Sequence, residues 1–136
     1  MNRLPATISA VETHGSIALV DAEAGGGRFS ATMIGAGEDV AAWQPGMPVT
    51  LLFKETEVSL AKNLAGMISM RNRIPATVQA VERGTVLARV SLLFAGYTIE
   101  SIITTRSSLA LALAPGDQVE ALVKANEMNI LPEPSA

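Results

Sequence analysis

The chain has 136 residues, enough for one ordinary domain or two small ones. Hydrophobic residues make up 49% of it and charged residues only 17%, a composition that supports a packed core and excludes disorder. The net charge of −3 and an aromatic content of 4% argue against a nucleic-acid binder that relies on electrostatics or base stacking.

The sequence contains no cysteine, which excludes thiolate metal sites and disulfides and fits a reducing compartment. The amino terminus lacks the long apolar stretch of a signal peptide. The longest apolar run, residues 109–115, is too short to cross a bilayer. We therefore expect a cytoplasmic protein with no membrane partner.

The chain consists of one unit used twice. The segment Asn-Arg-Leu-Pro-Ala-Thr-Ile at residues 2–8 recurs as Asn-Arg-Ile-Pro-Ala-Thr-Val at residues 72–78. At the same offset, Pro45-Gly46, Lys54 and Glu57 match Pro115-Gly116, Lys124 and Glu127. At the first turn, matching Gly15-Ser16-Ile17 with Gly84-Thr85-Val86 requires the second copy to lack one residue.

Each unit is predicted to contain short strands separated by turns. In the first unit we expect strands at 7–11, 16–20, 29–34, 49–53 and 58–60, the first of them beginning just after Pro5. In the second unit we expect strands at 77–81, 85–93, 98–104, 119–124 and 128–131. The Ala- and Leu-rich segments 36–44 and 106–114 each predict a short helix.

This pattern predicts an all-β protein of two tandem OB-like five-stranded β-barrels, each with a short helix. The domains are expected at residues 1–62 and 67–131, followed by a tail at 132–136. A unit of about 65 residues is small for a core that is stable alone. We therefore expect tight association between units or between chains, and a site between units is as plausible as one within a unit.

The candidate site begins at the junction of the two units, with Ser69-Met70-Arg71-Asn72. A hydroxyl, a guanidinium and an amide lie within four residues, and all three donate hydrogen bonds. No general base or nucleophile lies near them in the sequence, and no paired carboxylates or Ser/His/Asp set is evident elsewhere. We therefore expect an anion-binding protein and no enzyme. A surface ion pair is the alternative role for Arg71.

These residues, with four further segments, resemble the molybdopterin-binding-protein (Mop) family of molybdate-binding domains, which is TOBE-like. The further segments are Arg-Gly-Thr-Val at 83–86, Ile-Thr-Thr-Arg-Ser at 103–107, Pro-Gly-Asp at 115–117 and Val-Lys-Ala-Asn-Glu-Met at 123–128. The resemblance covers residues 67–131 and is weaker in the first unit. The whole chain looks like a tandem di-Mop protein of the molybdate-storage type.

The resemblance implies a homotrimer that binds molybdate or tungstate at interfaces between domains, with no organic cofactor and no directly bound metal cation. It assigns Ser69, Met70, Arg71, Asn72, Lys124 and Ala125 to one kind of site, with main-chain N–H groups near Met70 and Ala125. It assigns Thr85, Thr104 and Ser107 to a second kind, although these three could simply cap turns. Lys54 is a further candidate because it repeats Lys124; a solvated lysine at a strand end is the alternative for both.

The first unit departs from the family pattern. Met1-Asn2 leaves no room for the serine and arginine, and Thr-Met-Ile-Gly at 32–35 lacks the Ile-Thr-x-x-Ser ending. We therefore expect the two units to build unequal sites.

The function expected from the resemblance is intracellular storage and homeostasis of molybdate or tungstate. The alternative is an oxyanion-sensing regulatory or protein-interaction module that acts with a transporter or transcription factor. An OB-type nucleic-acid binder is a third interpretation, which the acidity and the scarce aromatic residues disfavour.

Overall fold

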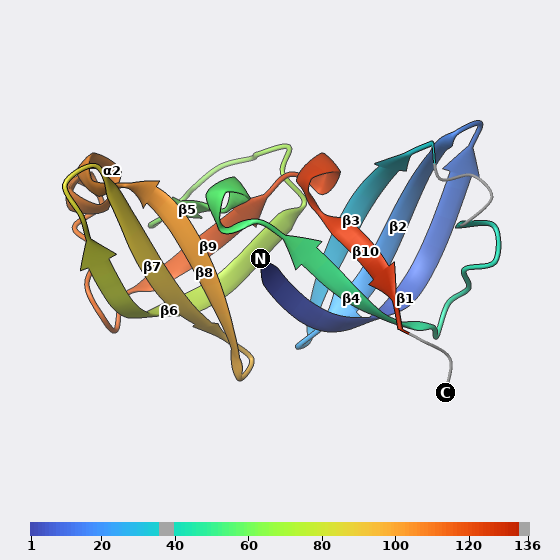
Figure 1. Cartoon of the computed structure of the whole chain (residues 1–136), viewed down its shortest axis with the longest axis horizontal. Helices are drawn as coiled ribbons and strands as arrows, with labels where there is room; N and C mark the ends of the chain where they lie inside the picture. Colours follow the sequence, from blue (N-terminus) through green and yellow to red (C-terminus); the bar gives the residue numbers. More distant parts are fainter. Residues whose placement is uncertain (36–39, 134–136) are drawn as a thin grey trace.

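The structure, a computed structural model, describes residues 1–35 and 40–133 as two curled five-stranded sheets set side by side (Figure 1). The first repeat supplies β1 (Asn2–His14), β2 (Ile17–Ala24), β3 (Gly27–Ile34) and β4 (Pro48–Phe53). The second supplies β6 (Asn72–Arg83), β7 (Leu87–Phe94), β8 (Tyr97–Thr104) and β9 (Gln118–Val123). The predicted all-β class with two OB-like units is confirmed.

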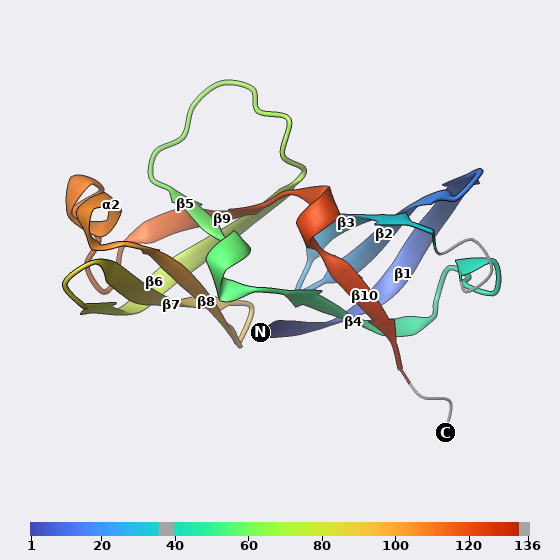
Figure 2. The same ribbon diagram turned by 45° about the horizontal axis from the view of Figure 1, so that its top comes forward.

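The fifth strand of each sheet comes from the other repeat. After β4, the 3₁₀ turn η1 (Glu55–Glu57) leads to β5 (Ser59–Ala61), which pairs with β9. After β9, η2 (Ala125–Glu127) leads to β10 (Asn129–Pro132), which pairs with β4. Figure 2 shows both crossings, and the loop from β5 to β6 that arches over the second sheet. The two repeats therefore exchange their last strands, and Glu133 continues the exchange by donating its N–H to Pro48 O.

β1 begins before Pro5, not after it as expected. Ile8 donates to Met47 O and accepts from Gly46 N, so the even-numbered residues of this segment direct their N–H groups toward β4. Pro5 therefore directs its nitrogen to the other side, where pairing with β2 starts only at Thr7. The missing N–H removes no ladder bond, and the strand continues through the proline.

The first turn keeps the repeat in register, and the expected loss of one residue is wrong. Gly35 N donates to Ser16 O in the first repeat, and Thr105 N donates to Val86 O in the second. Both contacts fit an offset of seventy, so Gly15 corresponds to Thr85.

The helix expected within 106–114 is α2 (Thr105–Ala110). Thr104 caps it, because its hydroxyl oxygen accepts a hydrogen bond from Ser107 N at 3.0 Å. The helix expected at 36–44 falls largely on residues 36–39, outside the described part of the chain. No helix among the described residues is long and apolar enough to cross a membrane.

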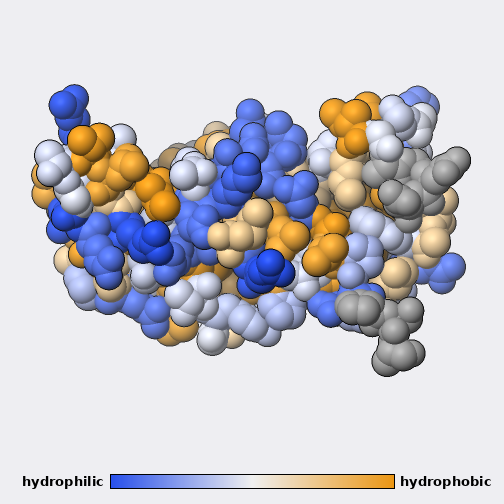
Figure 3. Space-filling view, viewed as in Figure 1, coloured by the Kyte–Doolittle hydropathy of each residue, from blue (hydrophilic) through white to orange (hydrophobic). Residues whose placement is uncertain are grey.

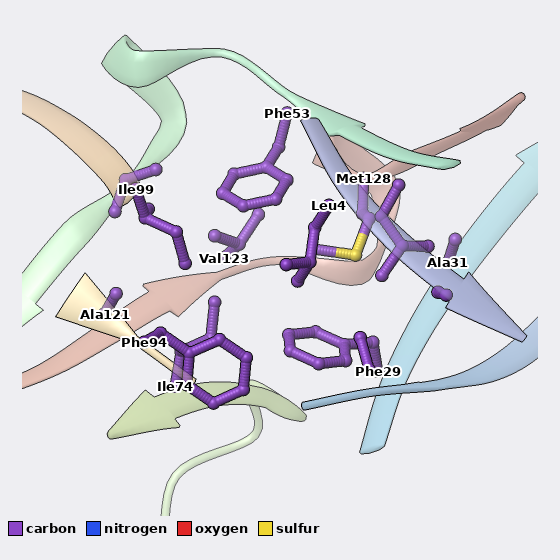
Figure 4. Close-up of a cluster of buried hydrophobic side chains, with 14 of the residues drawn as sticks. Leu4, Phe29, Ala31, Phe53, Ile74, Phe94, Ile99, Ala121, Val123 and Met128 are labelled. Carbon is purple, nitrogen blue, oxygen red and sulfur yellow. The ribbon is translucent and has the colours of Figure 1, made fainter. Parts of the chain in front are cut away.

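The core is continuous between the two sheets (Figure 4). Phe29 of β3 and Phe94 of β7 meet edge to face, with ring centroids 6.0 Å apart. The β2–β3 and β7–β8 hairpin tips also touch, since a Cβ added to Gly25 would lie 2.6 Å from Ala95 Cβ. The two repeats thus form one packed body, as expected for units too small to be stable alone.

Candidate anion-binding site

A cavity of about 230 Å³ lies where η2 passes the free edge of β3. It is lined by Thr32, Ser69, Met70, Arg71, Lys124, Ala125 and Asn126. Five of the predicted site residues are therefore brought together: Ser69, Met70, Arg71, Lys124 and Ala125. They come from two segments of the second repeat that precede β6 and follow β9, two strands that are paired side by side.

The cavity has the electrostatics of an anion site. The side chains of Arg71 and Lys124 are exposed, and neither has a carboxylate partner within residues 1–35 and 40–133. The lining contains no aspartate or glutamate. Two cations and two hydroxyl groups thus line a space that offers them no internal counter-charge, and an anion would supply it.

Asn72 follows Arg71 directly in the chain but does not line this cavity. It is fully buried, and its side-chain amide is held by the edge of β3. Ser30 N donates to Asn72 Oδ1 at 2.7 Å, while Asn72 Nδ2 donates to Ser30 O at 2.9 Å. Asn2 forms the same pair of bonds with Glu100 in the other repeat, both at 2.8 Å. Both asparagines therefore join the two sheets.

The corresponding crossing in the first repeat is built differently. Lys54 precedes η1 as Lys124 precedes η2, but Glu55 replaces Ala125 and Met1 replaces Arg71. The amino group of Met1 forms an ion pair with Glu55 Oε1. This hydrogen bond is the main cause of a lowered pKa of the Glu55 carboxyl. A carboxylate thus lies beside Lys54, whereas the lining around Lys124 has none.

The second predicted set is only partly brought together. Thr85 and Thr104 line a cavity of about 360 Å³ with Val86 and Arg106. Ser107 lines a different cavity, with Leu60 and Ile103 among its neighbours. Its hydroxyl accepts a hydrogen bond from Thr104 Oγ1 at 2.7 Å.

Sequence reasoning missed Thr32, Asn126 and Arg106. Asn126 and Arg106 lie inside the segments that carry the family resemblance, but the resemblance assigns neither of them to a site. Thr32 comes from the other repeat, and nothing in the sequence links it to Arg71. No group of three or more metal-binding side chains occurs in the described part of the chain.

Comparison with known proteins identifies the family. The TOBE domain model matches residues 1–60 and again 68–130. A stretch of 80 residues, 58% of this chain, is 44% identical to the molybdenum import ATP-binding protein ModC of Brucella abortus (strain 2308). A stretch of 59 residues, 43% of the chain, is 44% identical to the molybdenum-pterin-binding protein MopA of Rhodobacter capsulatus. The matched part spans 22% of each of these relatives.

A solved structure extends the likeness to the whole chain. The cytoplasmic molybdate-binding protein ModG, with molybdate bound, superposes with a TM-score of 0.91. The superposition covers 97% of this chain and 96% of ModG, at 27% sequence identity. With both of its repeats matched by one model, the chain belongs to the TOBE domain family.

Proposed function

We propose that this protein binds molybdate or tungstate for storage and homeostasis in the cytoplasm. The observation that carries the proposal is the convergence of Ser69, Arg71 and Lys124 on one cavity whose lining has no carboxylate. ModG, similar over the whole chain, is a cytoplasmic molybdate-binding protein, and ModC and MopA are named for molybdenum. The proposed activity is binding, with no catalytic step.

The chemistry of the cavity suits a tetrahedral dianion. All four oxygens of such an anion accept hydrogen bonds, and each bond from a charged donor contributes about 1.5–3 kcal/mol. Arg71 offers a planar fork of donors, and Lys124 offers a mobile point charge. The N–H groups of Met70 and Ala125 are the proposed main-chain donors.

We further propose a homotrimer, as the resemblance to the Mop family implies. Several apolar side chains are exposed near α2 and the β6–β7 turn: Val86 at 70%, Leu87 at 55% and Leu109 at 61%. Figure 3 shows apolar side chains gathered at the end of the molecule that carries α2. Contact with further copies would cover this surface and would bring a second chain to the cavity that holds Thr85 and Thr104.

The test is calorimetric titration of the purified protein with molybdate, repeated with tungstate and in excess sulfate, alongside light scattering for mass. We expect saturable binding that sulfate disturbs little. Arg71→Ala should bind at least tenfold more weakly, whereas the control Arg3→Ala, at an exposed position outside the cavity, should bind like the parent. Parent affinity in a folded Arg71→Ala protein would refute the site, and a parent that binds neither oxyanion would refute the function.

A second function is favoured by the ModC match, in which the matched stretch is a small part of a longer transport protein. The same fold would then sense the oxyanion on behalf of a partner. Pull-down from cell extract with and without molybdate distinguishes the sensing function from the storage function. A partner retained only with ligand supports sensing, and the same set of proteins in both arms supports storage.

A further inference from the structure

The cavity has one wall that comes from the first repeat. Thr32 of β3 lines it, while the other six lining residues all belong to the second repeat. Thr32 is partly buried, and no site role follows for it from the family segments or from its place in the sequence.

The backbone of β3 orients Thr32 toward the cavity. β3 is an edge strand, and Ser30 uses both its N–H and its C=O to bond Asn72 on the open side of the sheet. Gly35 N, at an odd-numbered position, bonds Ser16 O on the β2 side. In an antiparallel ladder these directions alternate along the strand. Thr32, two residues after Ser30, therefore directs its N–H to the same open edge, which is the edge that η2 and Arg71 approach.

The two hydrogen bonds between Asn72 and Ser30 fix the distance between Thr32 and Arg71 across the cavity. Asn72 follows Arg71 directly, and Ser30 lies two residues from Thr32. Two hydrogen bonds of 2.7 and 2.9 Å thus hold the first residue of β6 against β3, next to Arg71. A ligand held by Arg71 would meet a wall whose position is already set.

The other repeat provides a matched comparison. The position that corresponds to Thr32 is Ile102, since Leu19 pairs with Thr32 and Arg89 pairs with Ile102. At the crossing that contains Ser69 and Arg71, this position is therefore a threonine with a hydroxyl group. At the crossing that contains Met1 and Glu55, the same position is an isoleucine with a hydrocarbon side chain.

We propose that Thr32 is the first repeat's contribution to the oxyanion site, through its hydroxyl and its main-chain N–H. The inference rests on the proposed function, because it names a further ligand contact of the same cavity. It makes the site a composite of both repeats within one chain.

The test compares Thr32→Val, Thr32→Ser and Ile102→Val in calorimetric titrations with molybdate, with the thermal midpoint of each ligand-free protein as a check on folding. Valine replaces the hydroxyl by a methyl group at nearly constant volume and suits a strand. Thr32→Val should bind about tenfold more weakly, as expected for one lost hydrogen bond to a charged ligand. Thr32→Ser, which keeps the hydroxyl, should bind more tightly than Thr32→Val, and Ile102→Val should bind like the parent.

Parent affinity in Thr32→Val would overturn the assignment of Thr32 while leaving the site intact. An equal loss in Ile102→Val would also overturn it, because the effect would then not belong to this cavity. A parent protein that binds no molybdate would instead refute the proposed function, and with it the assignment.

Discussion

Asn72 and Ser30 are joined by two hydrogen bonds across the boundary between the two sheets, and Asn2 and Glu100 are joined in the same way. In both pairs a buried side-chain amide saturates the N–H and the C=O of one residue on an edge strand. Only the first pair lies next to Arg71. Variants of the two asparagines therefore distinguish an effect on ligand binding from an effect on stability.

Replacing either asparagine by alanine should lower the free energy of unfolding by about 2 kcal/mol, because the N–H and C=O of a partly buried residue lose their partners. Asn72→Ala should also weaken molybdate binding, because the segment that carries Ser69 and Arg71 is no longer fixed against β3. Asn2→Ala should leave the affinity unchanged. Urea unfolding and calorimetry on the two variants measure both effects, and an equal loss of affinity in both would contradict this division.

Lys124 and Lys54 form a second matched pair. Lys124→Ala should reduce molybdate affinity by about tenfold to a hundredfold, since a charged donor of the cavity is removed. Lys54→Ala should have a much smaller effect, because the crossing that contains Lys54 already holds an ion pair between Glu55 and the amino group of Met1. The dissociation constants and the number of bound anions are to be measured together. If Lys54→Ala also lowers the number of bound anions, both crossings hold ligand.

Gly25 marks the place where the two hairpin tips touch. Its φ of +55° is unfavourable for alanine, and the added Cβ would clash with Ala95 and with the ring of Phe94. Gly25→Ala should therefore destabilise the protein by about 2–4 kcal/mol, from backbone strain together with overpacking. The neighbouring Gly26, with φ +80° and open space around it, is the control. Gly26→Ala should lose only the strain part, as thermal or urea unfolding will show.

The ion pair between Arg73 and Glu120 predicts part of the pH dependence of stability. The guanidinium donates to both carboxylate oxygens, at 2.7 and 2.8 Å, and this lowers the pKa of Glu120 below its ordinary value of 4.5. A lowered folded-state pKa adds stability above pH 4.5, and this contribution disappears as the pH falls through the lowered value.

Urea midpoints measured from pH 3 to pH 7 should therefore fall less steeply at the acid end in Glu120→Gln than in the parent. The effect will be small, because the pair is partly exposed to solvent. Glu127→Gln is the control, since Glu127 forms no ion pair with residues of the described chain. A parent and a Glu120→Gln protein with parallel pH profiles would contradict the prediction.

Local patterns made much of this molecule predictable. The repeat, the β-branched runs and the turn residues gave the strands and the two-unit class, and the family segments indicated that Ser69, Arg71 and Lys124 lie close together. Thr32 was not predictable, because its approach to Arg71 depends on how two sheets pack side by side. The strand running through Pro5 was missed because the side toward which its nitrogen points depends on long-range pairing. The orientation of Asn72 was hidden for the same reason, since its partner is a backbone edge forty-two residues away.

The exchange of β5 and β10 makes each sheet depend on a strand from the other repeat. A chain with a single repeat would have to take that strand from a second molecule, and its folding would weaken on dilution. Here both repeats belong to one chain, so the missing strand is always present at an effective concentration of about millimolar. The pair of sheets should therefore survive dilution to levels at which contacts between separate chains come apart.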